Sequence, residues 1–247
     1  MRQTASVARR LTLISAACAA LGMPLAVGAQ SPSGASQDRR PVVAVLDYIN
    51  ASMRTDADYK VLSKGIATVL ASRLGEAESI RIVTREKLQE IIAEQALGKS
   101  GQVDASQAVQ VGKLLNAHHM IYGTYLVQPN GDTRITASAY SVETSEMEFS
   151  TQVRGHSDKM QDLIDQLGDK LATGMKLPAA RARPAGSASI GGLGELVILS
   201  KAIDADDRKV PAEAIPLYKM FLAKAPPTAY YAQRKMAEER IRNGGGE

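Results

Sequence analysis

Five apolar residues follow one another at Val42–Leu46, with no polar position among them. A strand with one face in water would alternate polar and apolar side chains, so this run is typical of a strand covered on both faces. Covering both faces of a sheet requires helices on each side. The chain is therefore expected to form a layered α/β fold.

The next segments supply helices with apolar stripes of the required spacing. The first stripe ends at Gly75, a residue type that favours the end of a helix. Shorter stripes at Leu88–Ile92 and Ala108–Leu115 predict two more helices, and Ile80–Thr84 predicts a second strand. The residues of the first stripe are Leu62, Ile66, Val69, Leu70 and Leu74.

Strands then follow in series. His119–Val127 and Arg134–Val142 flank a turn that contains Asn130 and Gly131, which favours a hairpin. In the next strand, residues 147–154, side chains of the two faces alternate along the chain. A helix over 157–175 with a long apolar stripe is expected to cover one of these faces. The expected covered face has Met147, Phe149, Thr151 and Val153, and the wet face has Glu148, Ser150, Gln152 and Arg154. The prediction is a mixed sheet packed with helices, spanning residues 41–177.

Residues 178–192 have the composition of a linker. They separate the predicted α/β domain from a small α-helical tail, residues 193–242. Three helical patterns are predicted, over 193–203, 211–225 and 228–242. The first two resemble a tetratricopeptide-like helix pair, in the spacing of Ala202, Ala214, Tyr218 and Pro226. An ordinary helical tail packed on the main domain is the alternative.

So short a tail is expected to leave apolar side chains partly exposed, because single helical repeats need neighbours to bury their faces. Clustered aromatic residues on such a surface favour protein binding. The candidate partner surface comprises Leu196, Val197, Tyr218, Phe221, Leu222 and Tyr230.

The N-terminus has the features of a signal peptide, residues 1–29. A basic start is followed by an uncharged stretch from Leu11 to Val27, and small residues precede Gln30. We expect cleavage between Ala29 and Gln30, leaving a flexible leader at 30–40. A retained anchor and lipid attachment at Cys18 are the alternatives, both less favoured by Pro24 and by the residues before the cysteine.

Charge and cysteine content exclude several classes of protein. The net charge is +4, but three of the 30 basic residues lie in the signal peptide, so residues 30–247 carry 27 basic against 26 acidic side chains. No basic stripe with interleaved aromatic residues is present, so no nucleic-acid binding is expected. Cleavage would also remove Cys18, the only cysteine, which excludes disulfides and thiolate chemistry.

Several segments resemble the soluble domain of the CsgG family, which includes a curli secretion component. They are Val42–Asp47, Thr84–Ile92, Glu94-Gln95 with Gly98 and Gly101, Ala108 with Gly112–Ala117, Ile121–Thr124, and Val142–Thr144 before Glu146. The resemblance covers roughly residues 41–155. It implies an α/β domain related to those of LpoB-type activators and the N-terminus of TolB.

The resemblance implies a function in the cell envelope. We expect a non-enzymatic periplasmic accessory protein that binds an envelope protein or associates with itself, with association to the outer membrane left open. The connections at 128–133 and 143–146 are short turns, so no membrane-spanning segment is expected in the mature chain. The alternatives are an LpoB-like activator of cell-wall synthases and a periplasmic small-molecule-binding protein or hydrolase.

A search for chemical groups predicts no catalytic, metal-binding or cofactor-binding residue. His118 and His119 point to opposite faces of one strand, and His156 has no nearby ligands in sequence. Asp47 lies at a strand end, where a turn or cap role is favoured over a site. Arg85 is expected to pair with acids near Glu86 and Glu90, the alternative being an anion or a partner carboxylate.

Overall fold

The computed structural model describes residues 40–52, 57–94, 105–178 and 191–244. All of these residues belong to one of the two compact units of the chain, which begins at residue 39. The predicted signal peptide, its cleavage site at Ala29 and Gln30, and residues 30–39 of the leader lie outside the described residues. They stay predictions.

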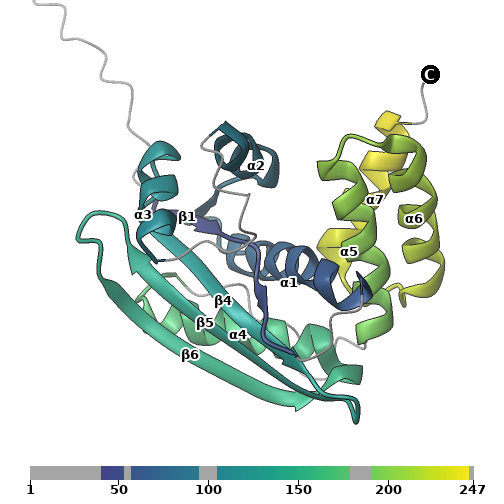
Figure 1. Ribbon diagram of the computed structural model, residues 1–247, viewed down its shortest axis with the longest axis horizontal. Coiled ribbons are helices and arrows are strands. Elements are labelled where there is room, and N and C mark those ends of the chain that lie inside the picture. Colours follow the sequence, from purple (N-terminus) through teal and green to yellow (C-terminus); the bar gives the residue numbers. More distant parts are fainter. Residues whose placement is uncertain (1–39, 53–56, 95–104, 179–190, 245–247) are drawn as a thin grey trace, which may run out of the picture. The chain divides into compact units, whose positions relative to one another are not determined.

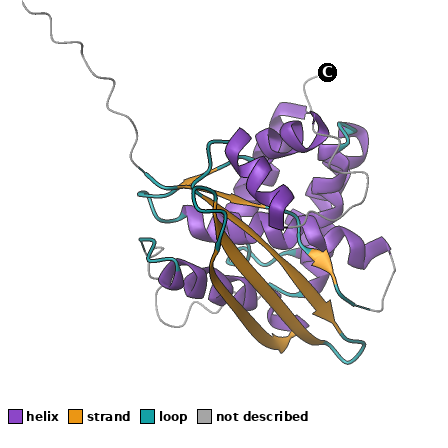
Figure 2. Cartoon of the chain, turned by 60° about the vertical axis from the view of Figure 1, so that its left-hand side comes forward, coloured by secondary structure: helices purple, strands orange, loops and turns teal. Residues whose placement is uncertain are grey.

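The described strands form one mixed sheet, as predicted (Figure 2). The sheet has six strands, and the sequence does not predict the short strand at Ile49–Asn50. β1 pairs in parallel with β3 and β4, β2 also pairs in parallel with β4, and β4, β5 and β6 pair antiparallel. The strand order is β3-β1-β4-β5-β6. The strands are β1 (Val42–Val45), β2 (Ile49–Asn50), β3 (Arg81–Ile82), β4 (His119–Val127), β5 (Asp132–Ser141) and β6 (Met147–His156).

The predicted helices are also present. In the sheet domain they are α1 (Ala57–Gly75), α2 (Arg85–Glu94), α3 (Ala105–Leu114) and α4 (Met160–Gly174), the last preceded by a short 3-10 turn at Ser157–Lys159. The tail has α5 (Leu193–Asp207), α6 (Pro211–Lys224) and α7 (Tyr231–Gly244). The α/β fold with a small helical tail is therefore confirmed.

Helices cover β1 from both sides, as its unbroken apolar sequence predicts (Figure 1). Val43 and Val45 belong to the core formed with α1 and α4. Val42, Ala44 and Leu46 belong to a second core formed with α2 and α3. All five side chains are buried, which is why no polar residue occurs in this strand.

α4 covers one face of β5 and β6, as predicted, and Val153 on that face is 3% exposed. The predicted burial of Met147 is wrong, because its side chain is 54% exposed. The pairing of β5 with β6 shifts register between Ala139 and Tyr140, next to the residue that pairs with Met147. A β-bulge of this kind interrupts the alternation of faces at the end of a strand.

The tail helices pack on the sheet domain chiefly through the contact of α5 with α1 (Figure 1). The expected exposure is therefore wrong for Leu196, Tyr218, Phe221 and Tyr230, all of which are at most 1% exposed. Val197 and Leu222 are half-buried. The sequence pattern indicates apolar side chains that must be buried, and they are buried in the core of the chain itself. The domain boundaries at 177 and 193 stay predictions.

Tyr230 shows how closely the end of the chain is joined to the sheet domain. Its backbone N–H donates to Gln161 Oε1 of α4 at 2.8 Å, and its hydroxyl donates to the Gly192 carbonyl at 3.0 Å. Burial raises the pKa of Tyr230 well above its ordinary value, so the phenol stays protonated as a donor. This aromatic side chain is an internal anchor of the tail.

Candidate functional site

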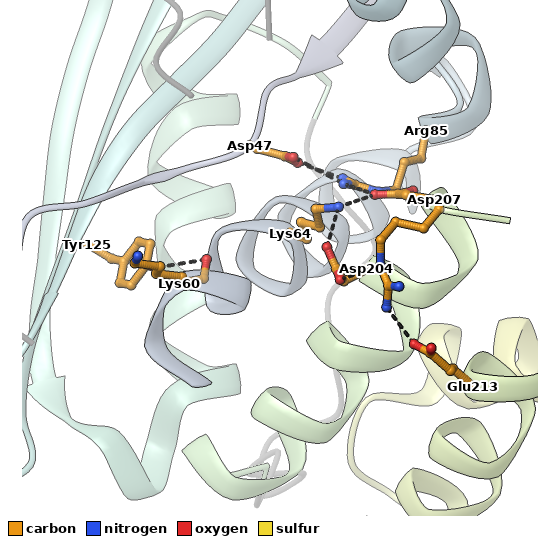
Figure 3. Close-up of polar contacts among 9 residues, drawn as sticks. Asp47, Lys60, Lys64, Arg85, Tyr125, Asp204, Asp207 and Glu213 are labelled. Carbon is orange, nitrogen blue, oxygen red and sulfur yellow. Dashed lines mark hydrogen bonds and ion pairs between the residues drawn. The ribbon is translucent and has the colours of Figure 1, made fainter. Parts of the chain in front are cut away.

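One arginine joins the sheet to the C-terminal helices. Arg85, the first residue of α2, donates two hydrogen bonds to the carboxylate of Asp47, at 2.6 and 3.1 Å. The same guanidinium donates to Asp207, with a shortest distance of 2.7 Å. Asp47 follows β1 and Asp207 ends α5, so a single side chain connects three segments that are far apart in sequence (Figure 3).

Lys64 on α1 completes this arrangement from the other side. Its Nζ lies 2.8 Å from both Asp204 Oδ1 and Asp207 Oδ2. Asp207 therefore bridges the two cations (Figure 3). We refer to Asp47, Lys64, Arg85, Asp204 and Asp207 as the charged cluster.

Further ion pairs extend the cluster toward α6 and α7. Arg208 contacts Asp204 at 3.1 Å and Glu213 at 2.7 Å. Arg240 of α7 contacts Asp206 at 3.1 Å and also pairs with Glu86 of α2. The first two residues of α2, Arg85 and Glu86, therefore contact α5 and α7 of the tail.

The charges of the cluster stabilise one another. Burial alone would lower the pKa of Arg85, but the carboxylates of Asp47 and Asp207 outweigh it and raise the pKa. The pKa of Lys64 is raised in the same way by Asp204 and Asp207, against the effect of burial. The pKa of Asp204 is lowered, since Lys64 and Arg208 outweigh the burial that would raise it. All three groups are therefore charged at neutral pH.

This pairing corrects the expectation for Arg85. Its partners are Asp47 and Asp207, whereas Glu86 pairs with Arg240 and Glu90 pairs with Lys87. Arg85 binds the two oxygens of Asp47 in a fork, and Lys64 contacts one oxygen each of Asp204 and Asp207. Since each cation holds two aspartates from different segments or turns, the cluster acts as a structural junction. The sequence singled out Asp47 and Arg85 but missed Lys64, Asp204 and Asp207, whose partners lie more than 100 positions away.

Beside the junction lies a groove of about 830 Å³, bounded by α1 on one side and α7 on the other. We call it the α1–α7 groove. On the side of the sheet domain the groove is lined by Val45 of β1, Ile82 of β3 and Leu88 of α2. Along the helices it is lined by Ala67, Ala71, Gly75, Ala232, Met236 and Glu239.

The lining of the groove suits binding better than catalysis. Most of it is apolar, and its guanidinium groups, Arg85 and Arg240, are engaged with carboxylates. Its volume falls within the roughly 300–1,000 Å³ of small-molecule sites. Among the described residues, neither cysteine nor histidine lines the groove, and Glu76, Glu86 and Glu239 bring carboxylates to its largely apolar lining.

The three histidines each have a local partner. His118 Nδ1 accepts from the Val42 N–H at 2.9 Å, His119 Nδ1 lies 2.7 Å from Glu148, and His156 Nδ1 lies 3.0 Å from Asp158. Across the described part of the chain, no group of three or more His, Cys, Asp or Glu side chains could hold a metal ion. The histidines thus have structural contacts at the ends of strands.

Comparison with protein families gives a match to part of the sheet domain. Residues 29–128 match the family described as "Curli production assembly/transport component CsgG". The match includes β1 to β4, and most of the segments that carry the resemblance lie in this region. The resemblance is confirmed over residues 29–128. No curated protein matches the chain.

Several solved structures are similar to part of the chain. The LpoB C-terminal domain from Salmonella enterica is 14% identical over 47% of this chain and 83% of that chain, with a TM-score of 0.40. TolB from Acinetobacter baumannii is 12% identical over 56% of this chain and 28% of that chain, with a TM-score of 0.35. The PelC dodecamer from Paraburkholderia phytofirmans is 15% identical over 57% of this chain and 91% of that chain, with a TM-score of 0.34. Likeness at this level carries no argument about function.

The described residues contain no helix that is both long and apolar enough to cross a membrane.

Proposed function

We propose that this chain is a non-enzymatic periplasmic accessory protein of the CsgG-like class, which acts by protein–protein interaction in cell-envelope assembly or secretion. The match of residues 29–128 to the curli assembly and transport family carries the proposal. The signal peptide expected at residues 1–29 supports export to the periplasm.

The chemistry of the site supports a binding role. The cations of the charged cluster are held by Asp47, Asp204 and Asp207, and the groove beside them has an apolar lining. A second candidate is a periplasmic small-molecule-binding protein, which the groove volume of about 830 Å³ favours.

Crosslinking in intact cells, followed by purification through a C-terminal tag, separates the two candidates. An accessory protein should capture one dominant envelope protein, and intact mass should show a chain that begins at Gln30 without lipid. A variant lacking residues 1–29 is the matched control, because it stays in the cytoplasm and should lose the partner. Exported chain that captures no protein but carries a bound small molecule would favour the second candidate and contradict the first.

A further inference from the structure

We infer that the α1–α7 groove binds an amphipathic helix of a protein partner, with an apolar face and basic residues flanking it. This inference rests on the proposed function and adds the place and the chemistry of the interaction. Three properties of the groove carry it: its two helical walls, the small side chains of one wall, and the charge of its rim.

The α7 wall presents one face of a helix over several turns. Ala232, Met236, Glu239 and Asn243 line the groove at spacings of three and four residues. At 1.5 Å per residue this face is about 16 Å long, which matches roughly three turns of a helix lying beside it. Packing against two helical walls is how amphipathic helices bind in grooves.

The α1 wall allows a close approach. It presents Ala67, Thr68, Ala71, Ser72 and Gly75, all of them small. Small side chains let a neighbouring helix come near, so that larger apolar side chains of that helix can reach Ile82 and Met236. Both of these side chains are partly buried and line the groove, so an apolar face would gain burial there.

The rim sets the charge of the partner. Glu76, Glu86 and Glu239 line the groove, and two of them are paired, Glu76 with Arg73 and Glu86 with Arg240. Each of these arginines also contacts a second carboxylate, Asp169 for Arg73 and Asp206 for Arg240. Arg85 pairs with Asp47 and Asp207. Carboxylates therefore dominate the rim, and complementarity favours lysine or arginine beside the apolar face of the partner helix.

The test uses the full chain from Gln30 and two labelled synthetic helices with the same leucine and alanine face. One carries lysine flanks and the other glutamate flanks. In fluorescence anisotropy titrations, the lysine helix should bind about tenfold or more tightly than its twin, and its binding should weaken as salt screens the rim. Equal binding of the twins, or binding of neither, would overturn the inference.

Variants locate the binding. Ala232→Arg places a charged side chain at an exposed position of the groove and should weaken binding of the lysine helix about tenfold. Ala223→Arg, at an exposed position of α6 outside the groove, is the matched control and should bind as the unchanged chain does. A lysine peptide with a central proline, which cannot stay helical, should bind poorly. Equal binding of that peptide would contradict a helical partner.

The same variants distinguish this inference from the proposed function. If the unchanged chain captures an envelope protein and Ala232→Arg captures it equally well, the function stands and the groove is not its site. If the unchanged chain captures no protein, the proposed function and this inference both fail.

Discussion

Gly65 of α1 faces Ser200 of α5 at a distance that only glycine permits: a Cβ atom on Gly65 would lie 2.0 Å from the Ser200 hydroxyl oxygen. The Ser200 hydroxyl cannot move away freely, because it donates to the Leu196 carbonyl at 2.6 Å within a fully buried contact. This close approach of two helices joins the tail to the sheet domain.

Gly65→Ala should therefore destabilise the protein although alanine favours helices. Overpacking at this contact is expected to lower the free energy of unfolding by roughly 1–3 kcal/mol, measured by urea denaturation. Gly194→Ala in α5 is the control, because no atom lies within 4 Å of its Cβ position, and it should gain up to about 1 kcal/mol. Equal effects of the two substitutions would contradict the contact.

Removal of the tail should prevent folding of the remaining domain. A chain ending at Leu177 lacks the buried side chains Leu196, Tyr218, Phe221 and Tyr230 and uncovers the face of α1 that packs on α5. We expect the truncated chain to aggregate or to show no cooperative thermal unfolding, since an uncovered apolar face is an aggregation surface. Cooperative unfolding of residues 30–177 at an unchanged midpoint would show that the sheet domain folds independently.

The sequence predicts the elements of this fold well, because local patterns report burial. The alternation on β6, the run at Val42–Leu46 and the stop at Gly75 each depend on neighbours within one strand or helix. β4 has the predicted bounds, His119–Val127. Periodicity does not say which surface buries a given helix face. A tail packed on the main domain is therefore only one of two alternatives, and the contact of α5 with α1 could not be predicted.

The candidate site shows the same limit. Arg85 is conspicuous at a junction between strand and helix, yet its partner Asp207 is 122 positions away. Acids close in sequence, such as Glu86, are the natural expectation when only local order is known. The pairing follows instead from the position of α5, which brings Asp204 and Asp207 to Lys64 on α1.

The charged cluster should contribute to stability through Arg85. Arg85→Met would leave the carboxylates of Asp47 and Asp207 close together without their shared cation. Because Asp207 is 13% exposed and Arg85 17% exposed, we expect a loss of roughly 3 kcal/mol in the free energy of unfolding, measured by urea denaturation. Arg208→Met, at a side chain that is 50% exposed, should cause a much smaller loss. Similar losses for both would contradict a special role of the junction.

The pairing of Lys64 with Asp204 should make stability depend on pH at both ends of the scale. The pKa of Lys64 is raised in the folded protein, so its contribution is complete below the unfolded value of about 10.4 and disappears as pH rises through the folded value. Lys64→Met should therefore differ most from the unchanged chain at neutral pH. The difference should shrink in strongly alkaline solution.

Asp204 governs the acid side of the same dependence. Its pKa is lowered in the folded protein, so its contribution is complete above the unfolded value of about 3.9 and is lost as pH falls through the lower, folded value. Asp204→Asn should lower the free energy of unfolding at pH 7, because the amide keeps the shape of the carboxylate but not its charge toward Lys64 and Arg208. As pH falls through that lower value the aspartate becomes protonated, and the two chains should approach equal stability. Urea denaturation at pH 7 and pH 3 measures the difference, and a gap that stays constant between these pH values would show that the charge of Asp204 does not contribute.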